Sequence, residues 1–320
     1  MAAAIEARGL RKSYDQIEAV RGIDLSVGEG EVFALLGPNG AGKTTTVEIL
    51  EGYRSRDAGE VSVMGHDPAR HERAFRARIG IVLQSTGVDP YLTVSETVQL
   101  YRQAYPNPRP LEEIVDLVGL AHKRDERVVK LSGGQQRRLD VAVALAGDPD
   151  LLFLDEPTTG FDPSARRNAW EVVKNLTALG KTVFLTTHYM DEAQYLAKEV
   201  AIIVGGLIVA QGPPGTLAGR DTAATIIRFR LREGSPALPP NLQAAATGTG
   251  GTVEVRTADP TRALHDLTGW ALDAGASLDG LEVSRPSLED VYLEITGTAS
   301  TGEGDEGEAI PAPIPGSHRR

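Results

Sequence analysis

The sequence contains no cysteine, so neither a disulfide nor a thiolate metal site can form in this chain. Long hydrophobic runs are also missing, because the most apolar long stretch, Val200–Ala210, is too short to span a bilayer and has two central glycines. The first residues do not follow the charged-then-apolar layout of a signal peptide. We therefore expect a chain that is soluble by itself and cytoplasmic, with any membrane role depending on a separate partner chain.

Basic residues are in the minority, with 33 lysines and arginines against 44 aspartates and glutamates. The resulting net charge of −11 disfavours a nucleic-acid-binding surface, although it leaves room for a local basic patch. The 320 residues, 41% of them hydrophobic, are enough to build the core of one large domain or of two ordinary ones.

One glycine-rich stretch of the sequence contains a phosphate-binding motif. Gly37–Thr44 reads GPNGAGKT and fits the phosphate-binding pattern G-x-x-x-x-G-K-[ST]. The apolar run Glu31–Leu36 before it predicts a buried strand, and a helix is predicted over Thr45–Tyr53. In this context we expect backbone N–H groups of the loop to close around the phosphates of a nucleoside triphosphate. Lys43 would reach the outer phosphates, and Thr44 would hold Mg²⁺.

Short apolar runs separated by turns predict strands on both sides of this loop. Residues 4–36 predict antiparallel strands leading into the phosphate loop, and further strands are predicted at 60–65 and 79–83. Tyr14 can stack on an adenine base, or it can be a half-buried strand tyrosine. Gln84 follows the last of these strands, where its amide can bind Mg²⁺ and orient water or can simply lie at the surface.

Residues 91–146 change character and predict a helical insert between two strands of the core. Periodic apolar segments indicate helices at Val94–Tyr105, Leu111–Val118 and Gly134–Ala146, and prolines separate the first two. Ser132 is a good N-cap for the last helix, and the two glycines after it leave backbone N–H groups uncovered. This helix start is either a second anion site or an ordinary capped terminus.

Two carboxylates and a histidine follow two more predicted strands. Leu151–Glu156 is an apolar strand that ends in Asp155 and Glu156. In a triphosphatase the first carboxylate holds Mg²⁺ and the second accepts a proton from the attacking water, whereas without a phosphate loop the pair would indicate a solvated turn. Thr182–Thr187 predicts the other strand, and His188 after it can donate a hydrogen bond to a γ-phosphate or serve a structural role.

A second, smaller unit is predicted after a β-hairpin at Val200–Gln211, with a domain boundary near Gly219. Its elements indicate an α+β unit with strands at 225–231, 252–256 and 281–284 and helices at 261–274 and 287–295. The first of these helices is expected to bury one apolar face made of Leu264, Leu267, Ala271 and Leu272. Residues 298–320 are rich in Gly, Pro, Glu and Asp and should be disordered.

Taken together, these motifs resemble the ATP-binding subunit of an ABC transporter. Gly37–Thr45 resembles the Walker A motif, residues 131–135 (LSGGQ) resemble the family signature, and Asp155 with Glu156 resembles the Walker B pair. The resemblance implies an α/β fold of the P-loop NTPase class, with a RecA-like core, an antiparallel β subdomain and a helical subdomain at about 86–148. The cassette would span residues 4–218, and a small α+β C-terminal domain would span 219–297.

The same resemblance assigns roles to single residues. Catalysis would involve Glu156, His188 at the H-loop and Gln84 at the Q-loop, while Thr44, Gln84 and Asp155 would hold Mg²⁺. A larger set would contact the nucleotide, ATP, namely Tyr14, Gly37, Pro38, Asn39, Gly40, Ala41, Gly42, Lys43, Thr44, Thr45, Ser132, Gly133, Gly134 and Gln135. One position departs from the family pattern, since Phe161 in the D-loop stands where leucine is usual. The change stays apolar, so we expect it to tune dimer contacts without removing activity.

The resemblance also implies partners. One signature per chain implies a head-to-tail homodimer, in which the Ser132 helix of one chain covers the ATP held by Lys43 of the other. Residues 285–294 resemble the C-terminal segment of daunorubicin-resistance exporter ATPases, and related subunits move polysaccharides, lipids and peptides. The resemblance implies a drug-like, lipid or polysaccharide substrate for this chain. The chain would then drive export through separate transmembrane permease subunits, touch them near Gln84–Tyr105, and lie peripherally on the inner face of the membrane.

Two other functions are weighed against export. A soluble ABC ATPase acting on ribosomes or nucleic acid generally carries two cassettes or a long coiled-coil arm, whereas this chain has one signature and no sustained heptads. No nucleic-acid partner is therefore expected. The energising subunit of an importer is the third possibility, and residues 285–294 count against it.

Overall fold

The computed structural model describes residues 3–82, 87–220, 223–232, 234–243, 246–247 and 251–297. Two parts of the chain with predicted features lie outside these described residues. They are Gln84, predicted to bind Mg²⁺, and residues 298–320, predicted to be disordered.

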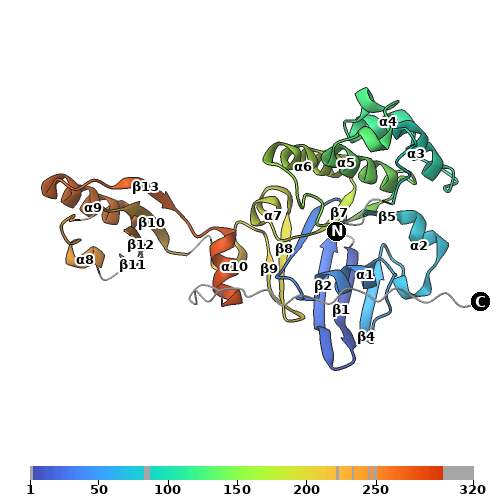
Figure 1. Ribbon diagram of the computed structural model, residues 1–320. Helices are drawn as coiled ribbons and strands as arrows, with labels where there is room; N and C mark the ends of the chain where they lie inside the picture. Colours follow the sequence, from blue (N-terminus) through green and yellow to red (C-terminus); the bar gives the residue numbers. More distant parts are fainter. Residues whose placement is uncertain are drawn as a thin grey trace, which may run out of the picture.

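A six-stranded sheet forms the centre of the larger body (Figure 1). Its strands stand in the order β5 (Ile79–Val82), β6 (Leu151–Asp155), β7 (Thr182–Thr187), β3 (Val32–Leu36), β8 (Glu199–Val204) and β9 (Leu207–Gly212). The first five run parallel, and only β9 pairs antiparallel with its neighbour. Gly205 and Gly206 form the turn of that hairpin with φ of 53° and 79°, a conformation that suits glycine best. The predicted hairpin is thus confirmed.

Helices cover one side of this sheet and form a separate helical subdomain (Figure 1). The subdomain contains α3 (Val94–Arg102), α4 (Leu111–Leu117), the 3₁₀ turns η2 (Ala121–Lys123) and η3 (Val128–Lys130), and α5 (Gly133–Ala144). The helical insert predicted from the sequence is therefore present. Two further helices, α6 (Pro163–Ala178) and α7 (Met190–Leu196), were not among the predicted elements.

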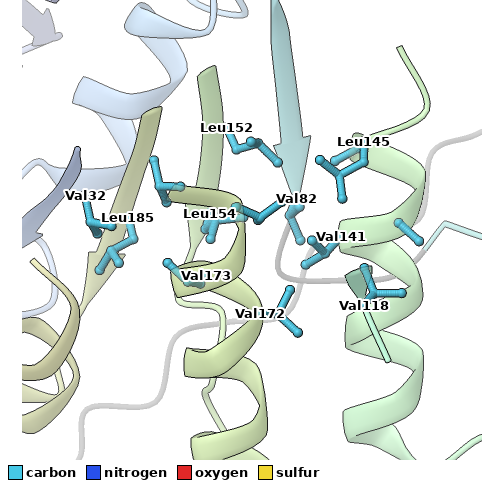
Figure 2. Packing of buried hydrophobic residues seen from close by; sticks show 14 of the residues in the cluster. Val32, Val82, Val118, Val141, Leu145, Leu152, Leu154, Val172, Val173 and Leu185 are labelled. Carbon is cyan, nitrogen blue, oxygen red and sulfur yellow. The ribbon is translucent and has the colours of Figure 1, made fainter. Parts of the chain in front are cut away.

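Alternating side chains bury both faces of the central strands. Along β3, Val32 and Leu36 belong to one hydrophobic cluster, whereas Phe33 and Leu35 belong to another on the opposite face. Figure 2 shows the first cluster, in which strand residues such as Leu154 pack against α5 and α6. This double burial is typical of parallel sheets and explains why these strands are continuous apolar runs in the sequence.

A three-stranded antiparallel sheet packs on the second face. Its strands are β1 (Ala3–Tyr14), β2 (Ile17–Gly28) and β4 (Ala58–Val63), in the order β2-β1-β4. Ile5, Leu10 and Ile23 join Phe33 and Phe153 of the central sheet in one cluster. The same side carries α1 (Lys43–Leu50), the turn η1 (Pro68–Arg70) and α2 (Arg73–Arg78). The α/β fold with an antiparallel subdomain is thus confirmed.

The C-terminal unit is a small α+β body with its own core. An antiparallel sheet in the order β11 (Ala246–Thr247), β12 (Thr252–Thr257), β10 (Thr225–Arg230) and β13 (Asp279–Ser284) carries α8 (Pro240–Gln243) and α9 (Pro260–Ala274). Phe229 and Val255 of the sheet pack against Leu267 of α9. One predicted core residue is wrong, because Leu272 is 84% exposed. It follows Ala271 around the helix by about 100°, which turns it away from the sheet, and Ala263 is buried in its place.

The last helix, α10 (Leu288–Thr296), leaves this unit and returns to the larger body (Figure 1). There it contacts α7 and the turn η4 (Leu217–Gly219). Leu288 is 1% exposed and belongs to the hydrophobic cluster of the central sheet, against which Tyr292 also packs. Arg220 Nε fixes the return by donating to the carbonyl of Pro286 at 2.9 Å. The helix therefore packs the C-terminal end of the described chain onto the larger body.

Candidate functional site

The candidate site lies at one edge of the central sheet, where three parallel strands end side by side. In the strand order, β7 stands between β6 and β3. Asp155 lies opposite Thr186, and Leu36 lies opposite Thr187, so these three strands end level with one another. The phosphate loop follows directly after β3 and His188 directly after β7, while Asp155 is the last residue of β6 and Glu156 comes next. The topology thus brings together residues that lie far apart in the sequence, at the edge where such sheets bind ligands.

The phosphate loop passes very close to neighbouring backbone. A side chain at Gly42 would place its Cβ only 2.3 Å from the carbonyl oxygen of Ala19, and Gly42 also has φ of 102°. Glycine is therefore required there. Helix α1 begins immediately afterwards, and no side chain of the described residues caps its start. Its first N–H groups and the positive end of its dipole are thus available to an anion.

Lys43 is held inside this loop. Lys43 is only 7% exposed, and its Nζ donates to the carbonyls of Gly37 at 2.7 Å and Pro38 at 3.1 Å. Burial lowers the pKa of Lys43, while the negative charges of Glu156 and Asp155 oppose this shift. An anionic phosphate in the loop would supply the charged partner that the two neutral carbonyls do not. Thr44, the predicted Mg²⁺ ligand next to it, is exposed.

The two carboxylates at the end of β6 have different environments. Asp155 Oδ1 accepts a hydrogen bond from the hydroxyl of Thr186. The backbone N–H of Glu156 donates to the same residue, and its nitrogen lies 3.1 Å from both the carbonyl oxygen and the hydroxyl oxygen of Thr186. The carboxylate of Glu156 accepts from Thr159 Oγ1 at 3.0 Å and lies 3.5 Å from Nδ1 of His188. One carboxylate is thus tied to the strand end, and the other is presented beside the histidine.

The residues present fit a magnesium ion better than a metal held by protein alone. Among the described residues, no three His, Cys, Asp or Glu side chains gather as a metal-binding cluster. Mg²⁺ commonly uses one or two carboxylates together with substrate phosphates and waters. The hydroxyl of Thr44 and the carboxylate of Asp155 match that donor chemistry. The third predicted ligand, Gln84, lies outside the described residues.

The predicted second anion site starts helix α5. Ser132 and Gln135 form a capping box, in which Ser132 Oγ accepts from the N–H of Gln135 at 3.3 Å and Gln135 Oε1 accepts from the N–H of Ser132 at 2.9 Å. The side-chain oxygen of Gln135 is thus engaged in its own helix start. Gly133 is exposed and Gly134 half-buried, so their backbone can be approached from outside.

This helix start and Glu156 open onto one cleft of about 650 Å³. The loop between β6 and α6, which contains the predicted D-loop, forms its other wall. Phe161 of that loop lines the cleft, and Asp162 caps α6 by accepting from the N–H groups of Ser164 and Ala165 at 2.8 and 2.9 Å. The lining residues are Ser132, Gly133, Gly134, Gln136, Arg137, Asp140, Glu156, Thr159, Gly160, Phe161, Asp162 and Ala165.

Tyr14 lies half-buried at the end of β1. The guanidinium of Arg54 lies 5.2 Å from its ring centre, and Lys12 Nζ lies 5.6 Å away. Arg54 is in turn paired with Glu48 at 2.5 Å. Adenine stacking by Tyr14 stays a prediction, and the two cations place positive charge beside the ring.

Some residues of this site were missed in the sequence. Thr186 bonds the carboxylate of Asp155 and the backbone N–H of Glu156, and its signal was two threonines at the end of an otherwise apolar strand. Arg137, on the signature helix, donates to the carbonyl of Asp155 at 2.8 Å. Glu192 is fully buried and accepts from Thr158 Oγ1 at 2.9 Å and from Trp170 Nε1 at 3.0 Å. A buried charged residue in a helix gives no periodic signal that names its partner.

Comparisons with known proteins agree with this geometry. A family model described as "ABC transporter" matches residues 20–159, and one described as "ABC transporter domain-containing protein-like, C-terminal domain" matches residues 225–287. The chain is 38% identical to the daunorubicin/doxorubicin resistance ATP-binding protein DrrA of Streptomyces peucetius, with 96% of this chain and 98% of the relative covered. It is also 38% identical to the Nod factor export ATP-binding protein I of Ralstonia nicotianae, with 92% and 94% covered.

Solved structures match about two thirds of the chain. The protein cbiO1 of Clostridium perfringens, part of the ABC transporter complex cbiONQ, has a TM-score of 0.61 at 27% identity, covering 67% of this chain and 90% of that one. An ATP-binding cassette in a dimeric post-hydrolysis state bound to ADP and Pi has a TM-score of 0.58 at 25% identity, covering 65% and 98%.

Proposed function

The chain belongs to the ATP-binding proteins of ABC transporters and is an ATPase, and we propose from that premise that it powers export through a separate permease. The substrate proposed is drug-like, lipid or polysaccharide. The observation that carries this proposal is the similarity to two export or resistance ATPases over nearly the whole chain, including the C-terminal unit. The strand-edge geometry supports the chemistry that such an ATPase performs.

The proposed roles follow from where each side chain lies. The loop N–H groups and Lys43 bind the phosphates, while Thr44 and Asp155, with Gln84, hold Mg²⁺. The ion, when bound, neutralises developing charge on the phosphate oxygens. Glu156 orients the water that attacks the γ-phosphorus and accepts its proton as the bond to the β-phosphate oxygen breaks. His188, adjacent to that carboxylate, hydrogen-bonds the γ-phosphate.

We further propose that two chains pack head to tail, as an assembly that completes two sites. The start of α5 and Glu156 border one open cleft, which offers room for a second chain to present its bound nucleotide. The dimeric state of the similar cassette bound to ADP and Pi supports this arrangement. Closure on ATP and reopening after hydrolysis would then be the motion that drives the permease.

The permease must supply the route across the membrane in this proposal. None of the helices in the described part of the chain is both long and apolar enough to cross a bilayer. We therefore expect the chain to sit in the cytoplasm and to join the inner face of the membrane through its partner. Fractionation of cells with and without the candidate permease gene tests this. Membrane attachment only with the permease is expected, and equal attachment in both strains would overturn the proposal.

A further inference from the structure

The backbone at Glu156 adopts a conformation that needs support. Its φ is 44°, in the left-handed region that non-glycine residues rarely occupy. The residue follows the last position of β6, so the chain turns sharply where the strand ends. Such a conformation costs free energy and persists only when surrounding contacts hold it in place. On one side, the N–H of Glu156 is held by Thr186.

On the other side, the carbonyls that flank Glu156 in the chain converge on one guanidinium group. Arg137 donates from Nη2 to the carbonyl of Asp155 at 2.8 Å and from Nε to the carbonyl of Pro157 at 3.4 Å. Arg137 is 8% exposed, and burial lowers its pKa. The planar fork of an arginine suits two acceptors at fixed separation, which a lysine cannot match.

The arginine comes from a different subdomain than the carbonyls it binds. It lies on α5, whose start at Ser132 forms the candidate nucleotide-covering site, whereas Asp155 and Pro157 belong to the central core. Asp140, on the same helix, lies 3.7 Å from Arg137 Nη1 and is also nearly buried. The negative charge of Asp140 holds the guanidinium group of Arg137 next to the end of β6. The contact therefore joins the orientation of the signature helix to the turn that presents Glu156.

We propose that Arg137 is a positioning residue, which holds the left-handed turn at Glu156 and so transmits the placement of the signature helix to the carboxylate within the same chain. This inference rests on the proposed role of Glu156 as the proton acceptor. Arg137 itself touches neither nucleotide nor water in this role. A purely structural tether between the subdomains would instead affect stability without acting through the carboxylate.

The test compares Arg137→Met with Arg138→Met. Arg138 is the next residue of the same helix, but it donates to the carbonyls of Val118 at 3.3 Å and Gly119 at 3.1 Å, within the helical subdomain. Single-turnover ATP hydrolysis, affinity for a fluorescent ATP analogue and thermal melting are measured on the full chain. We expect Arg137→Met to lower the hydrolysis rate by ~10-fold to ~10²-fold with nucleotide affinity nearly unchanged. Arg138→Met should keep the parental rate, whatever its melting temperature.

A double variant separates positioning from simple tethering. Because Arg137 acts through the carboxylate, Arg137→Met should cost little further rate in a Glu156→Gln background. The same proportional loss in both backgrounds, or equal behaviour of the Arg137 and Arg138 variants, would overturn the inference. If Arg137→Met does not fold, Arg137→Lys carries the same comparison and should lose rate by a smaller factor. A Glu156→Gln chain that hydrolyses ATP at the parental rate would instead overturn the proposed role of Glu156 as the proton acceptor.

Discussion

Nδ1 of His188 lies 3.5 Å from Oε2 of Glu156, although the two residues follow different strands of the central sheet. The contact exists because β6 and β7 are neighbours and end level with one another. Thr159 Oγ1 donates to the same carboxylate oxygen at 3.0 Å, so the orientation of the Glu156 side chain is set from two sides. A pre-oriented carboxylate beside a histidine is suited to place an attacking water and take its proton.

Glu156→Gln should therefore keep ATP binding and lose turnover by at least ~10², because glutamine has nearly the same shape but cannot accept the proton. If two chains clamp two nucleotides, blocked hydrolysis should also trap the closed pair. Steady-state ATPase assays, nucleotide titration and sizing with Mg²⁺-free ATP and with ADP measure these effects. A dimer is expected with ATP and not with ADP.

The two readouts of this variant separate the two claims. Parental turnover would remove Glu156 from the catalytic role. An inactive chain that stays monomeric with ATP would leave the catalytic role intact and would contradict unassisted dimer closure.

Lys43→Ala should behave differently, because it weakens binding itself. The ammonium group lies in the phosphate loop, where it is the cation best placed to meet the outer phosphates. We expect affinity for ATP to fall by at least ~10-fold, as loss of a charge-assisted contact would produce. Titration with a fluorescent ATP analogue measures this. Lys174→Ala, which removes a lysine stacked on Tyr195 of the neighbouring helix, is the control and should bind normally. Unchanged affinity in Lys43→Ala would exclude the phosphate-binding role.

Much of the fold could be predicted because its signals are local. The phosphate loop, the strand ending in Asp155 and the strand before His188 are each short patterns, and parallel strands bring their ends to one edge. The partners of those residues could not be predicted in the same way. The hydroxyl of Thr186 on β7 donates to the carboxylate of Asp155 on the adjacent strand β6. Arg137, from another subdomain, donates to the carbonyl of Asp155. Such contacts depend on register and packing, which a single sequence does not record.

Periodicity also failed where two apolar residues are adjacent on a helix. Ala271 and Leu272 both fit an apolar stripe by eye, yet only Ala271 faces the sheet. The sequence also could not predict which part of the chain α10 packs against, because its amphipathic pattern is the same in either case. Its Leu288 packs into the cluster of the central sheet rather than into the core of the C-terminal unit. The pattern predicts a buried face and leaves its partner open.

The packing of α10 on the larger body leads to a prediction on stability. Leu288→Ala removes a side chain that is 1% exposed and should lower the free energy of unfolding by about 2–5 kcal/mol. Leu272→Ala is the matched control, since Leu272 is 84% exposed and should change stability by less than about 0.5 kcal/mol. Chemical denaturation of both variants measures the difference. Equal effects in the two variants would show that α10 does not secure the larger body.

The last prediction concerns Glu51, which ends α1 and is only 7% exposed. Burial raises its pKa to about 8, and the charges of Asp155 and Glu48 add to the shift. Its position at the negative end of the helix dipole disfavours the charged form as well. Between its ordinary pKa of 4.5 and about 8, the folded chain holds a proton that the unfolded chain has released. Stability contributed by this group is therefore present at low pH and is lost as the pH rises through that window.

We expect the parental chain to lose up to about 1.4 kcal/mol of unfolding free energy per pH unit from this group across the window. Glu51→Gln, which is neutral at every pH, should remove that part of the dependence and stabilise the chain most at about pH 8 and above. Denaturation series without Mg²⁺ and nucleotide measure this, since a cation near Asp155 would change the charge that Glu51 experiences. Glu112→Gln is the control, because the Glu112 side chain is 66% exposed and paired with Arg124, and its charge does not contribute to the raised pKa of Glu51. Parallel pH profiles for the parent and Glu51→Gln would mean that Glu51 is already ionised in the folded chain.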